Sequence, residues 1–117
     1  MTLEFRLTHL GLDKIYDLTS PENHERGMYS MTQQMLADMN NYVPLENDSL
    51  RMSGHVEDNR FLVWDTPYAA AQFTGWINGS PVVNYTTPGT GPYWDQVARG
   101  NHLKDWKHAY VQGANLL

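Results

Sequence analysis

The sequence predicts an α+β fold: a small antiparallel sheet packed by one long helix, with a C-terminal helix and a long Gly/Pro loop. Three observations predict it. The N-terminus alternates between apolar and polar residues, a methionine stripe follows at helical spacing, and an Asn-Gly turn precedes a run rich in Gly and Pro. The sequence contains no repeat and no linker, so we expect residues 1–117 to form a single domain, which is long enough for a modest core.

Composition excludes several classes of protein. The hydrophobic fraction of 41% is too high for a disordered chain. The net charge of −5 opposes binding to the phosphate backbone, where affinity comes mainly from Lys and Arg. The absence of cysteine removes disulfides and thiolate chemistry, and it fits a reducing compartment. The N-terminus has no signal-peptide pattern, and no segment approaches the roughly 18–20 apolar residues of a membrane span, so we expect no membrane contact.

The first two elements follow directly from periodicity. Residues 2–8 alternate strictly, with Leu3, Phe5 and Leu7 on one side, which predicts a half-buried strand. Gly11 ends it, and residues 12–18 fit either a short helix or a loop.

Ser20 and Pro21 then have the pattern of a helix start, because Ser accepts a hydrogen bond from a free N–H and Pro is tolerated at the first helical position. The predicted helix covers residues 21–40, with an apolar face of Met28, Met31, Met35, Leu36 and Met39.

This methionine face is interpreted as core, with the alternative that part of it contacts a neighbouring subunit, because Met repacks easily. Gly27 lies within the same helix and weakens it by about 1 kcal/mol relative to Ala. Asn40, Asn41 and Pro44 end the helix.

The second half of the chain mixes short strands with a final helix. Residues 61–64 are apolar on both faces and predict a buried strand, and the alanines of residues 68–73 favour a short helix. Asn78-Gly79 predicts a hairpin between residues 76–77 and 82–83, because it supplies the positive φ angles of a tight turn. Residues 86–92 form a loop. A helix is expected from Trp94 to about residue 113, interrupted at Gly100, with a packed face of Val97, Leu103, Trp106 and Tyr110.

The residues that often carry chemistry do not form a convincing site. No two histidines have the i, i+4 spacing of a helical zinc motif; they are His9, His24, His55, His102 and His108. Gly89-Thr90-Gly91 lacks the Lys-Ser/Thr of a phosphate-binding loop and the third glycine of a dinucleotide fingerprint.

Two further arrangements are no more convincing. Ser53 and His55 with Glu57 or Asp58 lack a nucleophile elbow, and nothing in the sequence brings Asp95 and Asp105 together. We therefore expect no catalytic residue, no metal and no cofactor, and the protein is predicted not to be an enzyme.

Several short motifs resemble those of one known family. Asn41-Tyr42-Val43-Pro44 leads to residues 49–54, Ser-Leu-Arg-Met-Ser-Gly. Thr66-Pro67-Tyr68-Ala69 is followed by Gln72-Phe73, and residues 85–92 are followed by Trp94-Asp95 and Trp106-Lys107. Their order over residues 34–113, about two-thirds of the chain, resembles that of minor capsid, or neck and tail-completion, proteins of long-tailed bacteriophages. The chain departs from this pattern at residues 46–48, Glu-Asn-Asp, where the family has an Asp-Thr-Gly turn.

The resemblance implies a structural virion protein made in the host cytoplasm, a subunit of the head–tail connector that joins the DNA-filled head to the tail. It implies a homo-oligomeric ring, six- or twelve-fold, whose partners are other neck, portal-side and tail-terminator proteins. DNA would only pass through the channel. The family carries no catalytic residues. The alternative is a small cytoplasmic adaptor that binds proteins through an aromatic surface.

The segment after the second hairpin strand is the predicted interface. Its Thr/Pro/Gly run is too long and too stiff for a hairpin turn, and two large aromatics follow it at the start of a helix. The expected interface residues are Tyr85, Pro88, Gly89, Thr90, Gly91, Tyr93 and Trp94. Trp106 is expected to fix the helix to its own domain. The alternative is that Tyr93 and Trp94 belong to the core.

Overall fold

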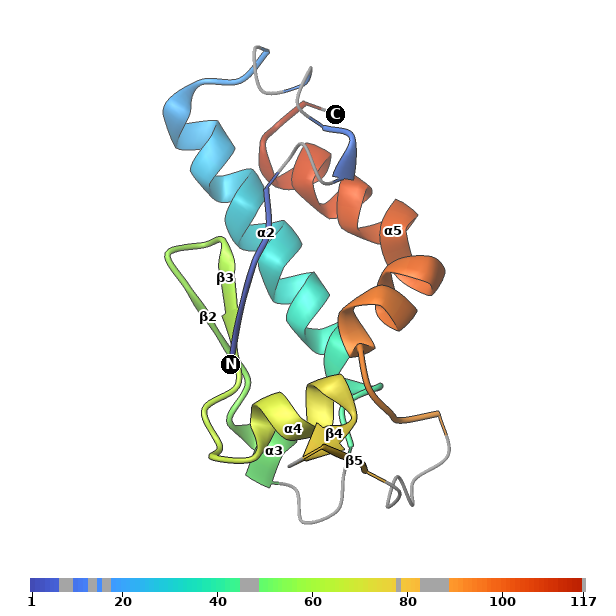
Figure 1. Ribbon diagram of the computed structural model, residues 1–117. Coiled ribbons are helices and arrows are strands. Elements are labelled where there is room, and N and C mark those ends of the chain that lie inside the picture. The colour runs from blue at the N-terminus through green and yellow to red at the C-terminus, as the bar shows by residue number, and fades with distance from the viewer. Residues whose placement is uncertain are drawn as a thin grey trace.

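The protein is an elongated α+β body of 47 × 23 × 23 Å, built around two long antiparallel helices (Figure 1). The computed structural model describes residues 1–6, 10–12, 15, 18–44, 49–77, 79–82 and 89–116. Helix α2 (Pro21–Asn40) is packed by a three-stranded sheet on one side and by helix α5 (Trp94–Gly113) on the other. This confirms the predicted fold class.

Helix α2 begins and ends where the sequence predicts. The Ser20 hydroxyl accepts a hydrogen bond from the backbone N–H of Asn23 (3.2 Å), and Pro21 occupies the first turn. Met31, Met35 and Met39 have no exposed surface, which confirms that the methionine face belongs to the core. The same face also buries two polar side chains, Thr32 and Asp38, which the apolar pattern did not include.

The sheet has the order β1-β3-β2 and is antiparallel throughout. The central strand β3 (Phe61–Val63) pairs with β1 (Thr2–Glu4) and with β2 (His55–Glu57), and these two place Thr2 and His55 opposite Val63. Leu62 and Val63 are buried, as expected for a strand that is apolar on both faces. In β1, Leu3 is half-buried between two exposed residues, which confirms the alternation for the described part of that strand.

Strand β2 was not predicted from the sequence. It enters β3 through a turn in which Asp58 (φ 52°) and Asn59 (φ 56°) both adopt left-handed backbone angles. Asp and Asn tolerate this conformation better than other non-glycine residues. The signal for a hairpin was therefore present, but the strand before it has a single aliphatic residue, Val56, and is too short to show alternation.

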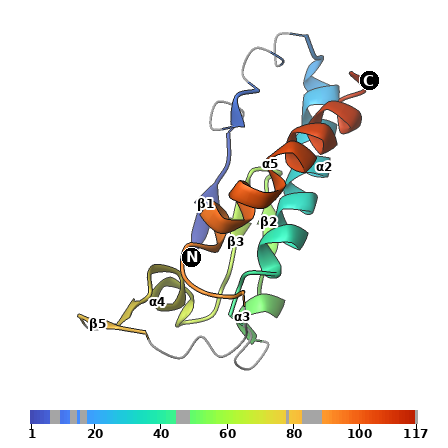
Figure 2. The same cartoon turned by 90° about the vertical axis from the view of Figure 1, so that its right-hand side faces the viewer.

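The short elements gather at one end of the body, opposite the C-terminus (Figures 1 and 2). They are α3 (Ser49–Met52), α4 (Ala69–Thr74), β4 (Trp76–Ile77) and β5 (Ser80–Pro81). Helix α4 confirms the short helix predicted for residues 68–73. The predicted hairpin is present, but its second strand is Ser80–Pro81, which begins two residues earlier than predicted. The pairing of Ile77 with Ser80 leaves a two-residue turn, in which Gly79 has a φ of 80°.

Helix α5 corrects two expectations: it continues through Gly100 without interruption, and Val97 is 45% exposed. Its buried residues instead recur every four positions, at Trp94, Ala98, Trp106 and Tyr110, with half-buried His102 between them. Four residues turn a helix by about 40° more than one full turn, so this stripe winds around the axis. A winding stripe that contains Ala and His does not produce the apolar pattern of a straight amphipathic helix.

Glycines allow the two long helices to approach closely. A Cβ atom on Gly27 would lie 2.8 Å from the ring of Tyr110 and 2.9 Å from its carbonyl oxygen. A Cβ atom on Gly113 would lie 2.5 Å from the hydroxyl of Ser30. Gly27 weakens α2 as an isolated helix, but it is what permits the packing of Tyr110 against it.

Candidate functional site

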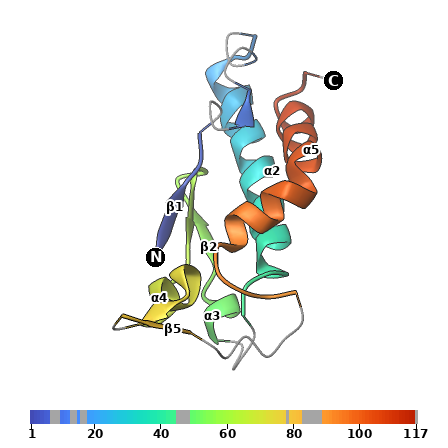
Figure 3. The same cartoon turned by 45° about the vertical axis from the view of Figure 1, so that its right-hand side comes forward.

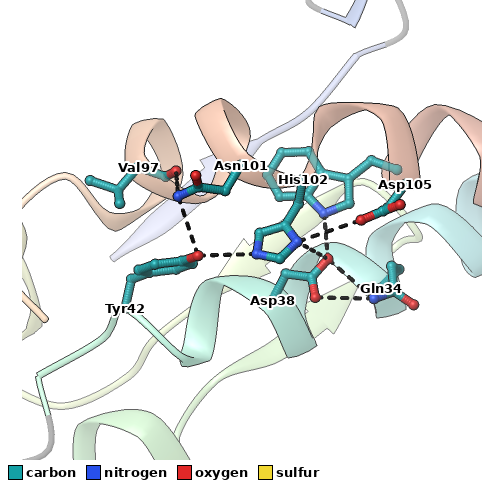
Figure 4. A network of polar contacts seen from close by, with 8 residues as sticks. Gln34, Asp38, Tyr42, Val97, Asn101, His102 and Asp105 are labelled. Atoms are coloured by element: carbon teal, nitrogen blue, oxygen red, sulfur yellow. Dashed lines mark hydrogen bonds and ion pairs between the residues drawn. The ribbon is translucent and has the colours of Figure 1, made fainter. Parts of the chain in front are cut away.

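A buried carboxylate in the last turn of α2 connects the two long helices. Asp38 of α2 is 8% exposed, and its Oδ2 accepts a hydrogen bond from the indole Nε1 of Trp106 on α5 (2.8 Å) (Figure 4). Gln34, one turn earlier on α2, donates to both carboxylate oxygens at 3.1 Å. A buried carboxylate is costly unless it accepts hydrogen bonds, so these donors account for its position in the core.

The imidazole of His102 extends this cluster toward the end of α2. Its Nδ1 lies 3.7 Å from Asp38 Oδ2 and 3.6 Å from Asp105 Oδ2, and its Nε2 lies 3.1 Å from the hydroxyl of Tyr42 (Figure 4). The Asn101 amide donates to the same hydroxyl at 3.3 Å. We call Asp38, Trp106, His102 and Tyr42 the helix clamp. Asp38 and Tyr42, at the end of α2, contact Trp106 and His102 of α5. The clamp therefore sets the position of α5 along the axis of α2.

The residues considered for nucleophilic catalysis have structural contacts instead. The hydroxyl of Ser53 donates to the carbonyl of Leu50 (2.7 Å) and accepts from the backbone N–H of Asp65 (3.1 Å). The ring of His55 contacts the Ser53 carbonyl through Nδ1 and the Glu57 carboxylate through Nε2. Ser53 and His55 are therefore not arranged for proton transfer between their side chains.

Five of the seven predicted interface residues can be placed. Tyr85 and Pro88 lie outside the described residues. Gly89, with a φ of 84°, Thr90 and Gly91 lie in the connection to α5, at the same end of the body as α3 and α4. The Gly91 N–H donates to the carbonyl of Tyr42 (3.3 Å), so this connection is attached to the end of α2.

Tyr93 lies at the position predicted for an interface aromatic. It caps α5 with left-handed backbone angles (φ 51°, ψ 47°), and its N–H donates to the carbonyl of Phe73 on α4 (2.8 Å). The ring packs edge-on against Phe73, with centroids 5.1 Å apart, and remains 42% exposed. The backbone of Tyr93 is therefore hydrogen-bonded both to α4 and to the first turn of α5, while part of its ring faces solvent.

Trp94 is a correction to the predicted interface. It has no exposed surface, and its ring packs edge-on against Trp64 (centroids 5.4 Å apart) and Phe73 (4.8 Å). The sequence placed both aromatics together because they are adjacent, but Tyr93 precedes the helix with left-handed backbone angles, whereas Trp94 is the first residue of the helix. Trp94 therefore belongs to the core and positions Tyr93, which confirms the alternative interpretation for one of the two residues.

Two exposed apolar side chains accompany Tyr93 at this end, and the sequence did not single out either for an interface. Met52 on α3 is 82% exposed, and Trp76 on β4 is 57% exposed. We call Met52, Trp76 and Tyr93, together with residues 89–91, the aromatic pole. Solvent-exposed Trp and Tyr gathered on one end of a small domain are typical of a protein-binding surface.

A comparison with protein families shows which family the chain belongs to. The family model for minor capsid proteins matches residues 7–114, nearly the whole chain. The chain belongs to the minor capsid protein family. It is a structural protein of the bacteriophage virion, as the order of its short motifs predicted. No curated protein and no solved structure matches it significantly. None of the described helices has the length and apolar character needed to cross a membrane.

The side chains that bind metals are dispersed in the part of the chain that the structure describes. No three or more His, Cys, Asp or Glu residues come together there as a set of ligands. Two histidines each lie near two carboxylates: His55 beside Glu57 and Asp65, and His102 beside Asp38 and Asp105. At the second of these, Trp106 and Gln34 already donate to the Asp38 carboxylate. The aromatic pole is therefore the candidate functional site.

Proposed function

We propose that this minor capsid protein is a subunit of the head–tail connector, the neck or tail-completion ring between the DNA-filled head and the tail. The observation that carries the proposal is the aromatic pole: Met52, Trp76 and Tyr93 stay exposed at one end of a narrow body. A ring requires heterologous contacts that close on themselves, and a body 47 Å long and 23 Å wide offers distinct ends and sides for such contacts.

The construction of the pole supports a docking role. The helix clamp and the buried Trp94 hold the first turn of α5 in place. The segment that leads into α5 is attached by two hydrogen bonds, from Tyr93 to α4 and from Gly91 to Tyr42 at the end of α2. An aromatic anchor held by a rigid scaffold loses little conformational entropy on binding. The partners in this proposal are further copies in a six- or twelve-fold ring and other neck, portal-side and tail-terminator proteins.

The charge of the protein is consistent with a channel through which DNA only passes. A net charge of −5 disfavours adhesion to the phosphate backbone. In this proposal DNA is in transit and is not a ligand.

The test is to remove the exposed aromatics without disturbing the core. Tyr93→Ala combined with Trp76→Ala should leave the melting temperature nearly unchanged and yield filled heads and free tails that do not join. Interface aromatics of this kind each contribute about 2 kcal/mol or more when buried by a partner. Tyr29→Ala is the matched control, because Tyr29 is 56% exposed on α2. Normal tailed particles from the double variant would refute the proposal.

A further inference from the structure

The sheet and α5 form two different sides of the molecule. Figures 1 and 3 show the sheet on one side of α2 and α5 on the other. Leu3, Val56 and Leu62 lie side by side on neighbouring strands and pack in the core. Because successive side chains of a strand point to opposite faces, Glu57 and Phe61 lie on the outer face of the sheet, away from the helices. The outer face of the sheet and the outer face of α5 therefore lie on opposite sides of the body.

The β2–β3 side of the sheet is acidic. Residues 55–65 contain three carboxylates, at Glu57, Asp58 and Asp65, and one arginine. The side chains of Glu57 and Asp65 are 58% and 63% exposed, and both lie beside the ring of His55, which offsets part of their charge when it is protonated. Asp58 at the turn is exposed and makes no ion pair among the described residues. The tip of the hairpin therefore presents negative charge to its surroundings.

The outer face of α5 is basic. Of the 8 basic and 13 acidic residues of the chain, α5 contains three and two, which leaves five and eleven for the rest. Asp95 is half-buried, and Asp105 lies 3.6 Å from the ring of His102. Lys104 is exposed and makes no ion pair among the described residues. It is two residues from both His102 and Trp106, which contact α2, and two helical residues differ by about 200°, so Lys104 lies on the face opposite α2.

We propose that neighbouring copies of this protein contact each other side by side, with the β2–β3 turn of one copy against the outer face of α5 of the next. The inference rests on the proposed function, because it names the contact that closes the ring. Glu57 and Asp58 of one copy then face Lys104 of its neighbour. The contact joins two different faces of the same chain, and repetition of such a heterologous contact around an axis closes a ring.

Charge complementarity favours a second copy in this orientation. Each copy offers its acidic side to one neighbour and the basic face of α5 to the other. A symmetric pair formed through two acidic sides, or through two α5 faces, would instead place like charges together, which is unfavourable at an interface. The net charge of −5 makes whole copies repel each other at long range. The contact is therefore weak between free copies and forms when assembly brings them together.

Introduced cysteines test the contact, because the chain has no cysteine of its own. Glu57→Cys and Lys104→Cys are combined in one chain in the phage genome, and purified particles are treated with a bis-maleimide shorter than the 23 Å width of the body. Since the two positions lie on opposite sides, this reagent links two copies and not two positions of one copy. The particles should give a ladder of products in a denaturing gel, and its last step should be the number of subunits in the ring.

The single variants and a matched pair are the controls for this cross-linking. Ala37→Cys with Lys104→Cys replaces the sheet position by an exposed position of α2 and should give no ladder. A dimer from Glu57→Cys alone, or from Lys104→Cys alone, would show that like faces meet and would overturn the proposal. Particles that contain the doubly substituted protein and give no ladder would overturn it as well.

Charge reversal supplies an independent readout. Lys104→Glu and Glu57→Lys should each leave the melting temperature nearly unchanged, because both side chains are exposed. Each should lower the phage titre by about tenfold or more, because like charges then face each other across the contact. The two changes in one chain should restore the titre to within about threefold of the wild type. A double variant no better than the single ones would overturn the proposal.

The outcomes separate this contact from the connector role. If the variant lacking Tyr93 and Trp76 fails to join heads to tails, while the side-face variants give no ladder and grow normally, only this inference fails. If all of these variants grow normally, the connector role fails too.

Discussion

Gly27 and Gly100 lie in the two long helices of the same small domain, and the structure predicts opposite effects for the same substitution. In Gly27→Ala, the new methyl group would lie 2.8 Å from two ring atoms of Tyr110 and 2.9 Å from its carbonyl oxygen. The ring can rotate, but the carbonyl belongs to α5 and moves only with the helix. Overpacking of this kind costs about 1–3 kcal/mol, which outweighs the gain of about 1 kcal/mol in helix propensity. The expected net loss of stability is about 1 kcal/mol.

In Gly100→Ala, the methyl group meets nothing within 4 Å, so only the propensity gain of about 1 kcal/mol remains. The two variants should therefore differ by about 2 kcal/mol. For a chain of 117 residues, 1 kcal/mol corresponds to about 4 °C in melting temperature. Calorimetry of the purified variants should show Gly27→Ala about 4 °C below the wild type and Gly100→Ala about 4 °C above it. If Gly27→Ala is as stabilising as Gly100→Ala, the close helix contact described here is wrong.

Three further predictions concern the core, the charge and the pH dependence. Met31→Asp should unfold the domain, because it buries an unpaired charge. Met52→Asp on the exposed pole should change the unfolding free energy by only about 0.5 kcal/mol. If Met31→Asp keeps the wild-type melting temperature, the core assignment is wrong. In roughly 0.15 M salt, a fluorescence anisotropy titration with duplex DNA should give no submicromolar dissociation constant, and such a constant would exclude the transit role. The Ser53 carbonyl, followed by Glu57 and Asp65, raises the pKa of His55 above 6.5. Because the folded pKa is the higher one, His55 stabilises the fold at low pH, and this contribution disappears as the pH rises through the folded pKa. Denaturant titrations from about pH 6 to 8 should show this decline in the wild type and a flatter profile in His55→Gln; equal slopes would rule it out.

Elements with a regular pattern could be predicted from the sequence, and elements built from polar contacts could not. Helix α2 has a cap, a proline at the first position and a straight methionine stripe, and all three signals agree with the structure. In α5 the buried stripe winds around the axis and includes Ala98 and His102, so its face was misassigned at Val97. Gly100 was taken as an interruption because helix propensity penalises glycine, but one such penalty is small beside the packing of Trp94, Trp106 and Tyr110.

The aromatic pole was predicted only in part for a related reason. Adjacent aromatics in a sequence give no indication of which one faces the core. The burial of Trp94 depends on Trp64 and Phe73, which are 30 and 21 residues away, and no local pattern connects them. Met52 and Trp76 are exposed because their short elements α3 and β4 lie at the end of the body, which is a property of the tertiary arrangement. The sequence indicated which types of residue to expect at an interface, whereas the fold determines which of these residues are exposed.

The helix clamp gives the aromatic pole a dependence on residues that lie far from it in the sequence. Asp38 and Tyr42 contact α5 through Trp106 and His102, and Tyr93 directly precedes the first turn of α5. Removing the Asp38 carboxylate would leave the indole N–H of Trp106 buried without an acceptor, at a cost of about 1–3 kcal/mol. Because the same contact holds α5 against α2, we expect its loss also to displace Tyr93, the residue of the pole that directly precedes α5. The stability of the fold and the position of Tyr93 in the proposed docking surface are therefore linked through one buried carboxylate.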